Sequence, residues 1–256
     1  MDTLKLFDLT GCRALITGSS QGIGFALARG LAGAGAEVVL NGLNIERLAN
    51  AAKVLRGEGA LVHELRFDVT EPEKVKEAID AFEEKTGSID ILINNAGMQF
   101  RAPLEEFPSD RFEELMRLNC NGPFYVGQAV ARHMIKRKAG KIVNICSVQT
   151  ALARPSIAPY TASKGALANL TKGMATDWAQ YGIQVNALAP GYFKTELTAA
   201  LVADEEFTAW LSGRTPARRW GDVSELVGAC VFLSSGASSF VNGHILYVDG
   251  GITVSL

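Results

Sequence analysis

The stretch RALITGSSQGIG, residues 13–24, decides the fold of this chain. Its apolar first half predicts a β-strand, and a helical pattern begins directly after its glycine-rich second half. Gly18, Gly22 and Gly24 permit a tight turn and a close approach of the backbone to a ligand, although glycines at such a junction can also serve packing alone. After the first strand of an alternating chain, this turn favours a dinucleotide site in which free helix N–H groups face a pyrophosphate.

Seven short apolar runs, rich in β-branched residues, alternate with helix-length segments along the chain. Most of these runs are apolar at successive positions, as expected for strands that helices cover on both faces. We therefore predict an α/β fold with one domain, residues 1–256, built on a Rossmann-like doubly wound parallel sheet of about seven strands. The predicted strands are Arg13–Thr17, Glu37–Asn41, Leu61–Asp68, Ile89–Asn94, Lys141–Ser147, Ile183–Ala189 and His244–Asp249.

The sequence predicts the first and last residues of three segments between the strands. One helix is predicted over Gly22–Gly33 and another over Pro72–Thr86, where residues 70–73 have the Thr-Glu-Pro-Glu pattern of a capping box with an early proline. Residues 192–221 follow one strand and delay the next without being a simple crossover. Their length predicts a substrate loop or lid.

The composition excludes several classes of partner and site. The chain of 256 residues has a formal net charge of −2, so no overall charge attracts nucleic acid or an anionic membrane. Its four cysteines and three histidines are scattered, which argues against a metal centre and suits reduced thiols. Because there is no leader-peptide pattern and no apolar run near the roughly 20 residues that span a bilayer, we expect a cytoplasmic protein.

Two further segments fit a dinucleotide cofactor. Phe67–Val69 ends the third predicted strand, where the Asp68 carboxylate is placed to accept a hydrogen bond from an adenine amino group. Asn94–Gly97 ends the fourth strand, which lies beside the first in a doubly wound sheet, at the crevice where ligands bind. Asp68 can equally cap a helix and the asparagine pair can form a turn, and each structural role is compatible with a ligand role.

The end of the second predicted strand bears on the choice between NAD and NADP. An acidic residue there selects NAD through the ribose 2′-hydroxyl, whereas a nearby arginine favours NADP. Here Asn41 is followed by Gly42 and Leu43, and Gln21 stands in the glycine turn, so these positions hold neither an acid nor an arginine. The missing acid leads us to expect NADP, with NAD as the alternative. Arg47 either reaches this site or is solvated on its helix.

Tyr160 and Lys164 lie four residues apart and therefore on one face of a helix. A lysine in this position stabilises tyrosinate, and we expect it to lower the tyrosine pKa from about 10 so that the phenol serves as a general acid and base. Ser147 ends a predicted strand at the same edge of the sheet, where its hydroxyl is placed to bond a substrate oxygen. Each feature alone is common, but behind a dinucleotide turn the three together predict a catalytic group.

Asn119 is the fourth candidate of this group. Asparagine is unfavourable inside a helix unless its side chain is hydrogen-bonded. Asn119 is placed either to hold a water that links Lys164 to solvent as a proton relay or to fix a helix kink through the backbone, and the two roles are compatible. Asn121 is close by in the sequence and is the less favoured candidate.

In order and spacing these motifs resemble the short-chain dehydrogenase/reductase family over essentially the whole chain. The resemblance implies hydride transfer at the nicotinamide C4 of NADP or NAD, with Tyr160 exchanging the carbonyl proton and Lys164 holding the nicotinamide ribose. It further implies that Ser147 orients the substrate and that Asn119 completes the proton relay. The cofactor-binding residues it implies are Gly18, Ser20, Gln21, Gly22, Ile23, Gly24, Asn41, Leu43, Asp68, Val69, Asn95, Ala96, Gly97, Tyr160, Lys164, Pro190, Gly191 and Thr195.

Four segments outside these motifs bear on the substrate. They resemble a branch of the family that interconverts a secondary alcohol and a ketone on a small sugar acid, D-gluconate and 5-keto-D-gluconate. The segments are Asn144–Gln149, Arg214–Gly221, Phe240–His244 and Asp249–Ile252.

Two arginines support a small anionic substrate. Arg101 follows the Asn94–Gly97 turn and Arg154 lies between Ser147 and Tyr160, so both are placed to approach the cleft and clamp a carboxylate. Surface arginines that form weak ion pairs would show the same pattern. The expected substrate-binding residues are Arg101, Ser147, Gln149, Arg154, Tyr160 and Tyr192.

Two other functions and an assembly state complete the expectations. Reduction of a 3-oxoacyl group on acyl carrier protein is the main alternative, because the basic residues 132–138 could dock an acidic carrier, although such a run is more often a solvated helix end. A cofactor-binding regulator without turnover is the second alternative. Such a protein would be expected to lack Tyr160 or Lys164, and this chain has both. The family resemblance also implies a homotetramer, and the apolar segment Ile245–Leu256 suits either subunit contact or a buried last strand.

Overall fold

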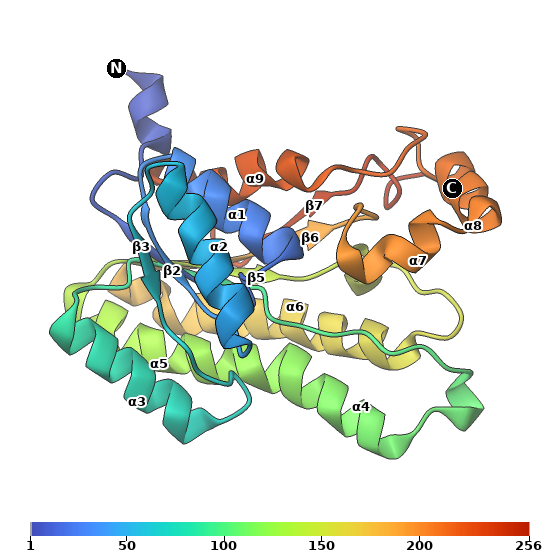
Figure 1. The fold of residues 1–256 in the computed structure, drawn as a ribbon, viewed down its shortest axis with the longest axis horizontal. Coiled ribbons are helices and arrows are strands. Elements are labelled where there is room, and N and C mark those ends of the chain that lie inside the picture. The colour runs from blue at the N-terminus through green and yellow to red at the C-terminus, as the bar shows by residue number, and fades with distance from the viewer. Residues whose placement is uncertain (1, 256) are drawn as a thin grey trace.

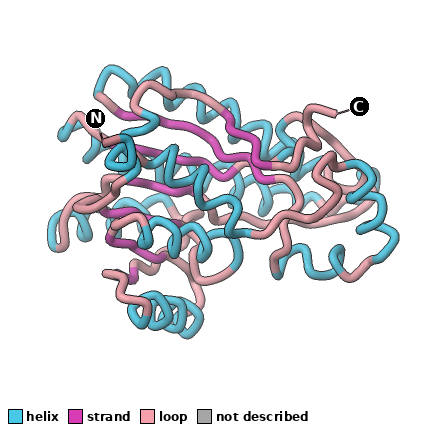
Figure 2. Tube along the Cα trace, turned by 90° about the horizontal axis from the view of Figure 1, so that it is seen from above, coloured by secondary structure: helices cyan, strands magenta, loops and turns pink. Residues whose placement is uncertain are grey.

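The computed structural model describes residues 2–255, with the backbone alone described for Leu197. Within this range seven strands form one parallel sheet in the order β3-β2-β1-β4-β5-β6-β7, which confirms the predicted α/β fold (Figures 1 and 2). Met1 and Leu256, which belong to the predicted domain and the predicted contact segment, lie outside the described residues. The strands are β1 Arg13–Ile16, β2 Glu37–Leu40, β3 Val62–Glu64, β4 Ile91–Asn94, β5 Gly140–Ile145, β6 Ile183–Pro190 and β7 Ile245–Val248.

Helices cover both faces of the sheet. In Figure 1, α1, α2 and α9 lie on one side of the strands, and α3, α4, α5 and α6 lie on the other. The order of the strands reverses at β1, because β2 and β3 extend to one side of it and β4 to β7 extend to the other. The helices are α1 Gly22–Gly33, α2 Ile45–Gly57, α3 Pro72–Lys85, α4 Ser109–Met116, α5 Gly122–Arg137, α6 Ala158–Trp178, α7 Ala199–Val202, α8 Glu205–Arg214 and α9 Val227–Ser234.

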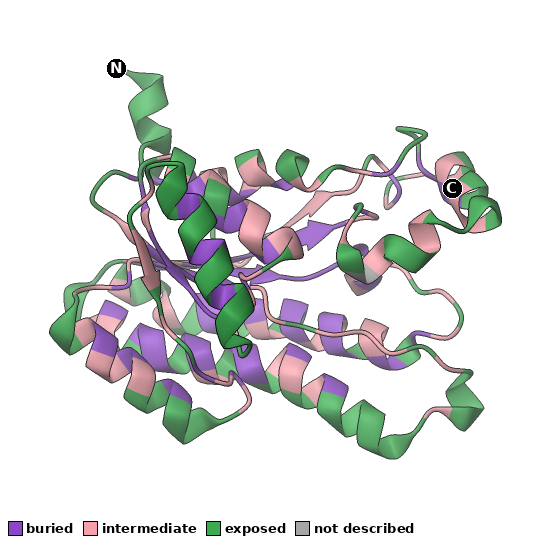
Figure 3. Ribbon diagram, viewed as in Figure 1, coloured by how far each residue is buried: buried purple, intermediate pink, exposed green. Residues whose placement is uncertain are grey.

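Successive residues of the central strands pack into two different hydrophobic cores, one on each face of the sheet. Ala14 and Ile16 of β1 pack in the core that contains residues of α1, α2 and α9, whereas Leu15 packs in the core that contains residues of α3, α5 and α6. Buried residues accordingly follow the sheet and the inner faces of the helices (Figure 3). Full burial of a leucine or isoleucine side chain stabilises the fold by about 1.5–3 kcal/mol, which explains why the strands are apolar at consecutive positions.

The third strand is shorter than predicted. The prediction of Leu61–Asp68 is wrong in extent, because β3 ends at Glu64. Its neighbour β2 ends at Leu40, and beyond that point the Asn41 side chain replaces a partner strand by donating from Nδ2 to the carbonyl oxygens of residues 65 and 67, both at 3.0 Å. The remaining strands agree with the predicted ranges to within two residues at each end.

The predicted capping box before α3 is also wrong. The helix begins at Pro72 as expected, but its N-cap is Glu71, whose side chain forms no capping hydrogen bond. The Thr70 hydroxyl and N–H instead donate to Asp68 Oδ1, both at 2.8 Å. Because Asp68 forms this local turn, Thr70 is directed back along the chain and away from the helix N-terminus.

The segment 192–221 departs from the regular alternation, as its length predicted. It contains α7 and α8, and its two ends meet at an isolated parallel bridge between Phe193 and Gly221. The Gly221 N–H donates to the Tyr192 carbonyl at 2.9 Å, and the Lys194 N–H donates to the Gly221 carbonyl at 3.1 Å. The segment is thus closed at its base. No helix within residues 2–255 is both long and apolar enough to cross a membrane.

Candidate active site

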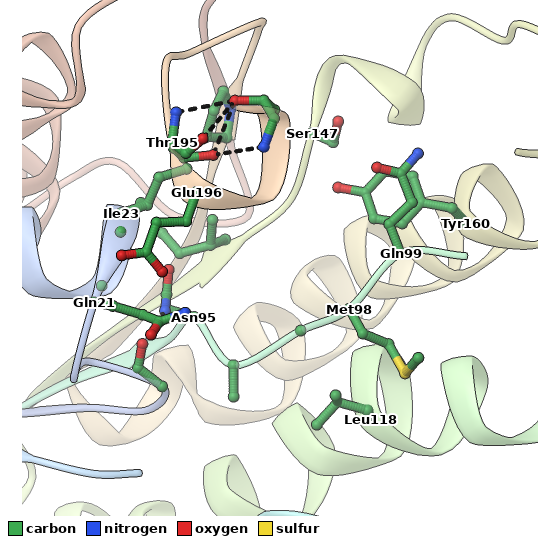
Figure 4. A pocket seen from close by; sticks show the side chains of 18 of the residues that line it. Gln21, Ile23, Asn95, Met98, Gln99, Leu118, Ser147, Tyr160, Thr195 and Glu196 are labelled. Carbon is green, nitrogen blue, oxygen red and sulfur yellow. Dashed lines mark hydrogen bonds between the residues drawn. The ribbon is translucent and has the colours of Figure 1, made fainter. Parts of the chain in front are cut away.

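One cavity of about 490 Å³ opens where the carboxyl ends of β1, β4, β5 and β6 meet. Its walls include every predicted cofactor-binding and substrate-binding residue, so the fold brings together side chains from position 18 to position 195 (Figure 4). This location is the one expected for a ligand site, because the strand order reverses between β1 and β4. Asn119 is the one predicted site residue that does not line the cavity; its side chain is fully buried behind it.

The glycine turn and the loop after β4 form one structural unit. The Thr17 hydroxyl accepts hydrogen bonds from the N–H groups of Asn95 and Ala96 at 2.9 and 3.0 Å. In return, Asn95 Nδ2 donates to the carbonyl oxygens of Thr17 and Gly18 at 2.9 and 3.0 Å. The turn expected for the asparagine pair is not found, because Asn94 ends β4 and residues 95–97 form an irregular loop. The Asn95 side chain instead fixes the shape of the glycine loop.

Two glycines of this loop leave no room for a side chain. Gly18 has a φ of +61°, and a Cβ at this position would lie 2.9 Å from Ala96 Cα. A Cβ at Gly24 would overlap the Gly18 carbonyl oxygen and the Asn95 amide. The backbone at the start of α1 is consequently open to the cavity, and its free N–H groups fit a pyrophosphate.

Asn41 and Asp68 carry structural hydrogen bonds as well as lining the cavity. The Asn41 side chain holds the chain beyond β3, and its Oδ1 also accepts from the Gly18 N–H at 3.4 Å. The Asp68 carboxylate is held through Oδ1 by Thr70, so its expected alternative role as a helix cap is wrong: the N-cap of α3 is Glu71, and Asp68 forms a local turn before it. In both residues the structural role coexists with a position in the wall of the cofactor cavity.

Two arginines lie at the far edge of the glycine turn. Arg47 lines the cavity and donates from Nη1 to Gln21 Oε1 at 3.0 Å, so it reaches this edge instead of being solvated alone. Arg66 donates from Nε to the Leu43 carbonyl at 3.0 Å. Neither forms an ion pair with an acid in the described part of the chain. Sequence reasoning missed Arg66, because a strand was expected through that position.

Tyr160, Lys164 and Ser147 converge on the cavity as predicted. Lys164 Nζ lies 5.8 Å from the Tyr160 ring centroid, consistent with two side chains on one face of α6. The ammonium group is buried and donates to the Ile145 carbonyl at the end of β5 at 2.8 Å. Ser147 follows β5 by two residues, and its Oγ accepts from the Gln149 N–H at 3.2 Å.

The pKa values of this group are set chiefly by burial. Burial raises the pKa of Tyr160 to about 12, while the hydrogen bond from the Ser147 hydroxyl to its oxygen lowers it. Burial also lowers the pKa of Lys164. The prediction that Lys164 brings the Tyr160 pKa below its usual value is therefore wrong for this arrangement, because lost hydration of the phenolate outweighs the stabilising groups. The phenol is protonated at neutral pH, as a general acid must be.

Asn119 lies in a π-helical turn, Arg117–Asn121, between α4 and α5. Its Oδ1 accepts from the Met98 N–H at 2.8 Å, and its Nδ2 donates to the Met98 carbonyl at 2.9 Å and to the Ser163 hydroxyl at 3.1 Å. The side chain thus holds the backbone that lines the cavity, which is the structural role expected as an alternative to a relay. Asn121 is exposed on the same turn.

The substrate end of the cavity is lined by Arg101, Gln149, Arg154 and Tyr192. Neither arginine forms an ion pair with any acid among residues 2–255, so the expected alternative of weak surface ion pairs does not apply. Burial lowers the pKa of Arg101, and the charge of Arg154 lowers it further. Two cations near one wall without an acid between them favour an anionic ligand.

The basic run at residues 132–138 lies away from this cavity. It ends α5, directly before the start of β5, and therefore lies at the opposite edge of the sheet. His133 contacts Asp80 at 2.7 Å and Arg137 binds Glu83 at 2.6 Å, both on α3. Two of its basic side chains are thus engaged within the molecule, which weakens the case for docking an acidic carrier protein.

Comparison with known proteins agrees with this geometry. A model of the protein family described as enoyl-(acyl carrier protein) reductase matches residues 18–253. Gluconate 5-dehydrogenase of Gluconobacter oxydans (strain 621H) is 65% identical over 251 residues, which cover 98% of this chain and 98% of that protein. The chain belongs to the short-chain dehydrogenase/reductase family.

Further members of the short-chain dehydrogenase/reductase family are similar over their full length. The 5-keto-D-gluconate 5-reductase of Escherichia coli (strain K12) is 53% identical over 251 residues, covering 98% of this chain and 99% of that protein. A crystal structure of a gluconate 5-dehydrogenase from Burkholderia cenocepacia J2315, in complex with NADP and tartrate, matches this structure with a TM-score of 0.97. The two sequences are 59% identical, and the match covers 99% of this chain and 100% of that chain. The resemblance expected from the motifs is confirmed, and the chain is an oxidoreductase of this family.

Proposed function

We propose that this protein interconverts D-gluconate and 5-keto-D-gluconate with NADP as the hydride carrier. The observation that carries the proposal is the single cavity in which a glycine turn, the Tyr160 phenol and two unpaired arginines meet. Relatives at 53–65% identity bear the names of this reaction in its two directions. The family alone would not name a substrate, whereas the unpaired cations favour an anionic one.

The residues of the cavity perform the acid–base part of this reaction. A bound nicotinamide cofactor would supply the hydride chemistry, which moves a hydride between its ring and the carbon that is carbinol in the alcohol and carbonyl in the ketone. During oxidation Tyr160 takes the hydroxyl proton, and during reduction it gives that proton to the carbonyl oxygen. The Ser147 hydroxyl orients the same substrate oxygen and stabilises its developing charge. Lys164, buried at the foot of the cavity, would hold the nicotinamide ribose, and a water held beside Asn119 would link Lys164 to solvent as the proton relay.

The choice of NADP rests on the edge of the glycine turn. Arg47 and Arg66 converge there on Gln21 and Leu43, and neither is neutralised by an acid among residues 2–255. A phosphate on the ribose 2′ position is a dianion that guanidinium groups bind through paired hydrogen bonds. The NADP complex of the Burkholderia enzyme supports this choice, because that protein is 59% identical.

The remaining expectations belong to the same proposal. Residues 192–221 act as a substrate lid, and the enzyme works in the cytoplasm as a homotetramer. Phe112 on α4 and Phe124 on α5 expose 43% and 40% of their surface, which gives apolar material for a subunit contact on that side of the molecule. Light scattering coupled to size-exclusion chromatography would measure the assembly, and a monomer at micromolar concentration would reject the tetramer.

The decisive experiment offers D-gluconate with NADP and with NAD in parallel and follows absorbance of the reduced nicotinamide. We expect turnover with NADP at a kcat/KM at least about tenfold above that with NAD, equivalent to about 1.4 kcal/mol. Tyr160→Phe is the matched control and should retain NADP binding while turnover falls by orders of magnitude. Activity on a 3-oxoacyl thioester without activity on D-gluconate would reject the proposed substrate.

A further inference from the structure

Arg154 lacks the partners that a half-buried guanidinium normally has. Its Nε is buried without a hydrogen-bond partner, and no acid among residues 2–255 forms an ion pair with it. Arg101 lies on the same wall of the cavity, where the two positive charges repel each other. A buried donor without a partner lowers the stability of the fold, so this group is kept in place against a penalty.

An aromatic ring holds Arg154 where an acid would be expected. The guanidinium carbon lies 5.6 Å from the ring centroid of Phe207, on α8. The negative face of the ring attracts the cation without using any of its hydrogen-bond donors. No hydrogen bond within residues 2–255 engages the Nη groups of Arg154, so their donors stay available to a ligand, whereas the buried Nε is without a partner. A carboxylate partner within the protein would instead have consumed two of them.

Phe207 is itself fixed by other aromatic side chains of the segment 192–221. Its ring centroid lies 5.8 Å from that of Tyr192, 5.3 Å from that of Trp210 and 6.2 Å from that of Trp220. Trp220 Nε1 in turn donates to the Thr208 hydroxyl at 3.2 Å. Phe207 does not line the cavity, so it reaches a ligand only through the residues it supports.

We propose that Phe207 is a positioning residue that presents the Arg154 guanidinium to the cavity and thereby sets the preference of the enzyme for a carboxylate substrate. The proposal rests on the proposed function in so far as that substrate is a sugar acid. It adds that recognition of the carboxylate depends on α8, a part of the chain that follows the catalytic residues in the sequence.

The test measures the dissociation constant of tartrate, a dicarboxylate, by calorimetry on the full-length protein with saturating NADP. Phe207→Leu removes the ring, Arg154→Gln removes the charge, and the double variant completes a thermodynamic cycle. We expect Phe207→Leu to weaken tartrate binding by about fivefold or more when Arg154 is present and by less than about twofold in the Arg154→Gln background. Phe207→Tyr, which keeps the ring, should restore binding to within about twofold.

Phe7→Leu is the matched control. It makes the same ring-to-leucine change at an exposed position outside the segment 192–221, and Phe7 is not among the rings that contact Phe207. It should leave tartrate binding within about twofold of the wild type. Phe207→Met, with a similar side-chain volume, replaces Phe207→Leu if the latter lowers the melting temperature by more than about 5 °C, which marks a global loss of stability.

Two results would overturn the inference. Equal weakening by Phe207→Leu in both backgrounds would show that Phe207 acts independently of Arg154. No tartrate binding by the wild type would show that the arginine pair does not take carboxylates. If coupled tartrate binding is found but the wild type does not oxidise D-gluconate, the proposed function fails and the role of Phe207 stands.

Discussion

The side-chain amide of Asn119 is joined to the main chain of Met98 by two hydrogen bonds of 2.8 and 2.9 Å. Asn119→Asp keeps the shape but replaces the donor with an oxygen that faces the Met98 carbonyl oxygen. We expect the free energy of unfolding to fall by about 1–3 kcal/mol and kcat to fall with it, because the wall of the cavity loses its brace. Denaturant unfolding and steady-state kinetics measure the two effects.

Asn121→Ala is the control for this prediction, since Asn121 lies on the same π-helical turn but is exposed. It should change the free energy of unfolding by less than about 0.5 kcal/mol. If Asn119→Asp and Asn121→Ala behave alike, the bond to Met98 has no special importance.

The raised pKa of Tyr160, about 12, predicts opposite pH dependences for the two directions. Reduction needs the protonated phenol, which is the dominant form at all pH values below that pKa. Oxidation needs the phenolate. At pH values below the pKa, the phenolate fraction rises about tenfold for each unit by which the pH is raised. Initial rates should therefore stay nearly constant for ketone reduction from about pH 7 to 9 and rise steadily for alcohol oxidation. An oxidation rate that levels off near neutral pH would contradict this assignment.

Arg101→Ala should raise the KM for D-gluconate by about tenfold or more without changing the dissociation constant of NADP. The reason is that one of the two unpaired cations at the substrate end is removed, and a charge-assisted hydrogen bond contributes about 1.5–3 kcal/mol. Arg111→Ala provides the control, because Arg111 is exposed and paired with Glu114. An unchanged KM in Arg101→Ala would remove this residue from the substrate site.

Arg47→Ala and Arg66→Ala should each weaken binding of NADP by about fivefold or more while NAD binding stays within about twofold. Both side chains are held at the edge of the glycine turn, by Gln21 and by the Leu43 carbonyl, where a 2′-phosphate adds two negative charges. Quenching of intrinsic fluorescence by each cofactor gives the two dissociation constants. Lys53→Ala, on the exposed side of α2, is the control, and parallel losses for NAD and NADP would refute the assignment.

Gly24→Ala should abolish measurable cofactor binding. The added methyl group would overlap the Gly18 carbonyl oxygen and the Asn95 amide, which together shape the loop that faces the pyrophosphate. Gly33→Ala, on the same helix, meets open space and should leave binding unchanged while stabilising the helix by up to about 1 kcal/mol. Calorimetric titration with NADP compares the two variants. Normal binding by Gly24→Ala would show that this loop does not hold the cofactor.

The sequence by itself determined the fold class and most of the site. Residues 13–24 place a glycine turn between a strand and a helix, and the runs of consecutive apolar residues require a sheet buried on both faces. Such local patterns also located Ser147, Tyr160 and Lys164, because parallel strands end at one edge and a spacing of four residues selects one helix face. These inferences depend on periodicity and steric limits, which act between near neighbours in the chain.

Only the tertiary structure decided how distant groups act on one another. Burial by several elements raises the pKa of Tyr160, although the adjacent lysine alone predicts the opposite direction. Arg66 reaches Leu43 because β3 ends early, at Glu64, and the Asn41 side chain takes over the pairing beyond it. Arg154 meets Phe207 across more than fifty positions of sequence. The free energy of desolvation and long-range contacts of this kind depend on how the whole molecule packs, so no local pattern of residues encodes them.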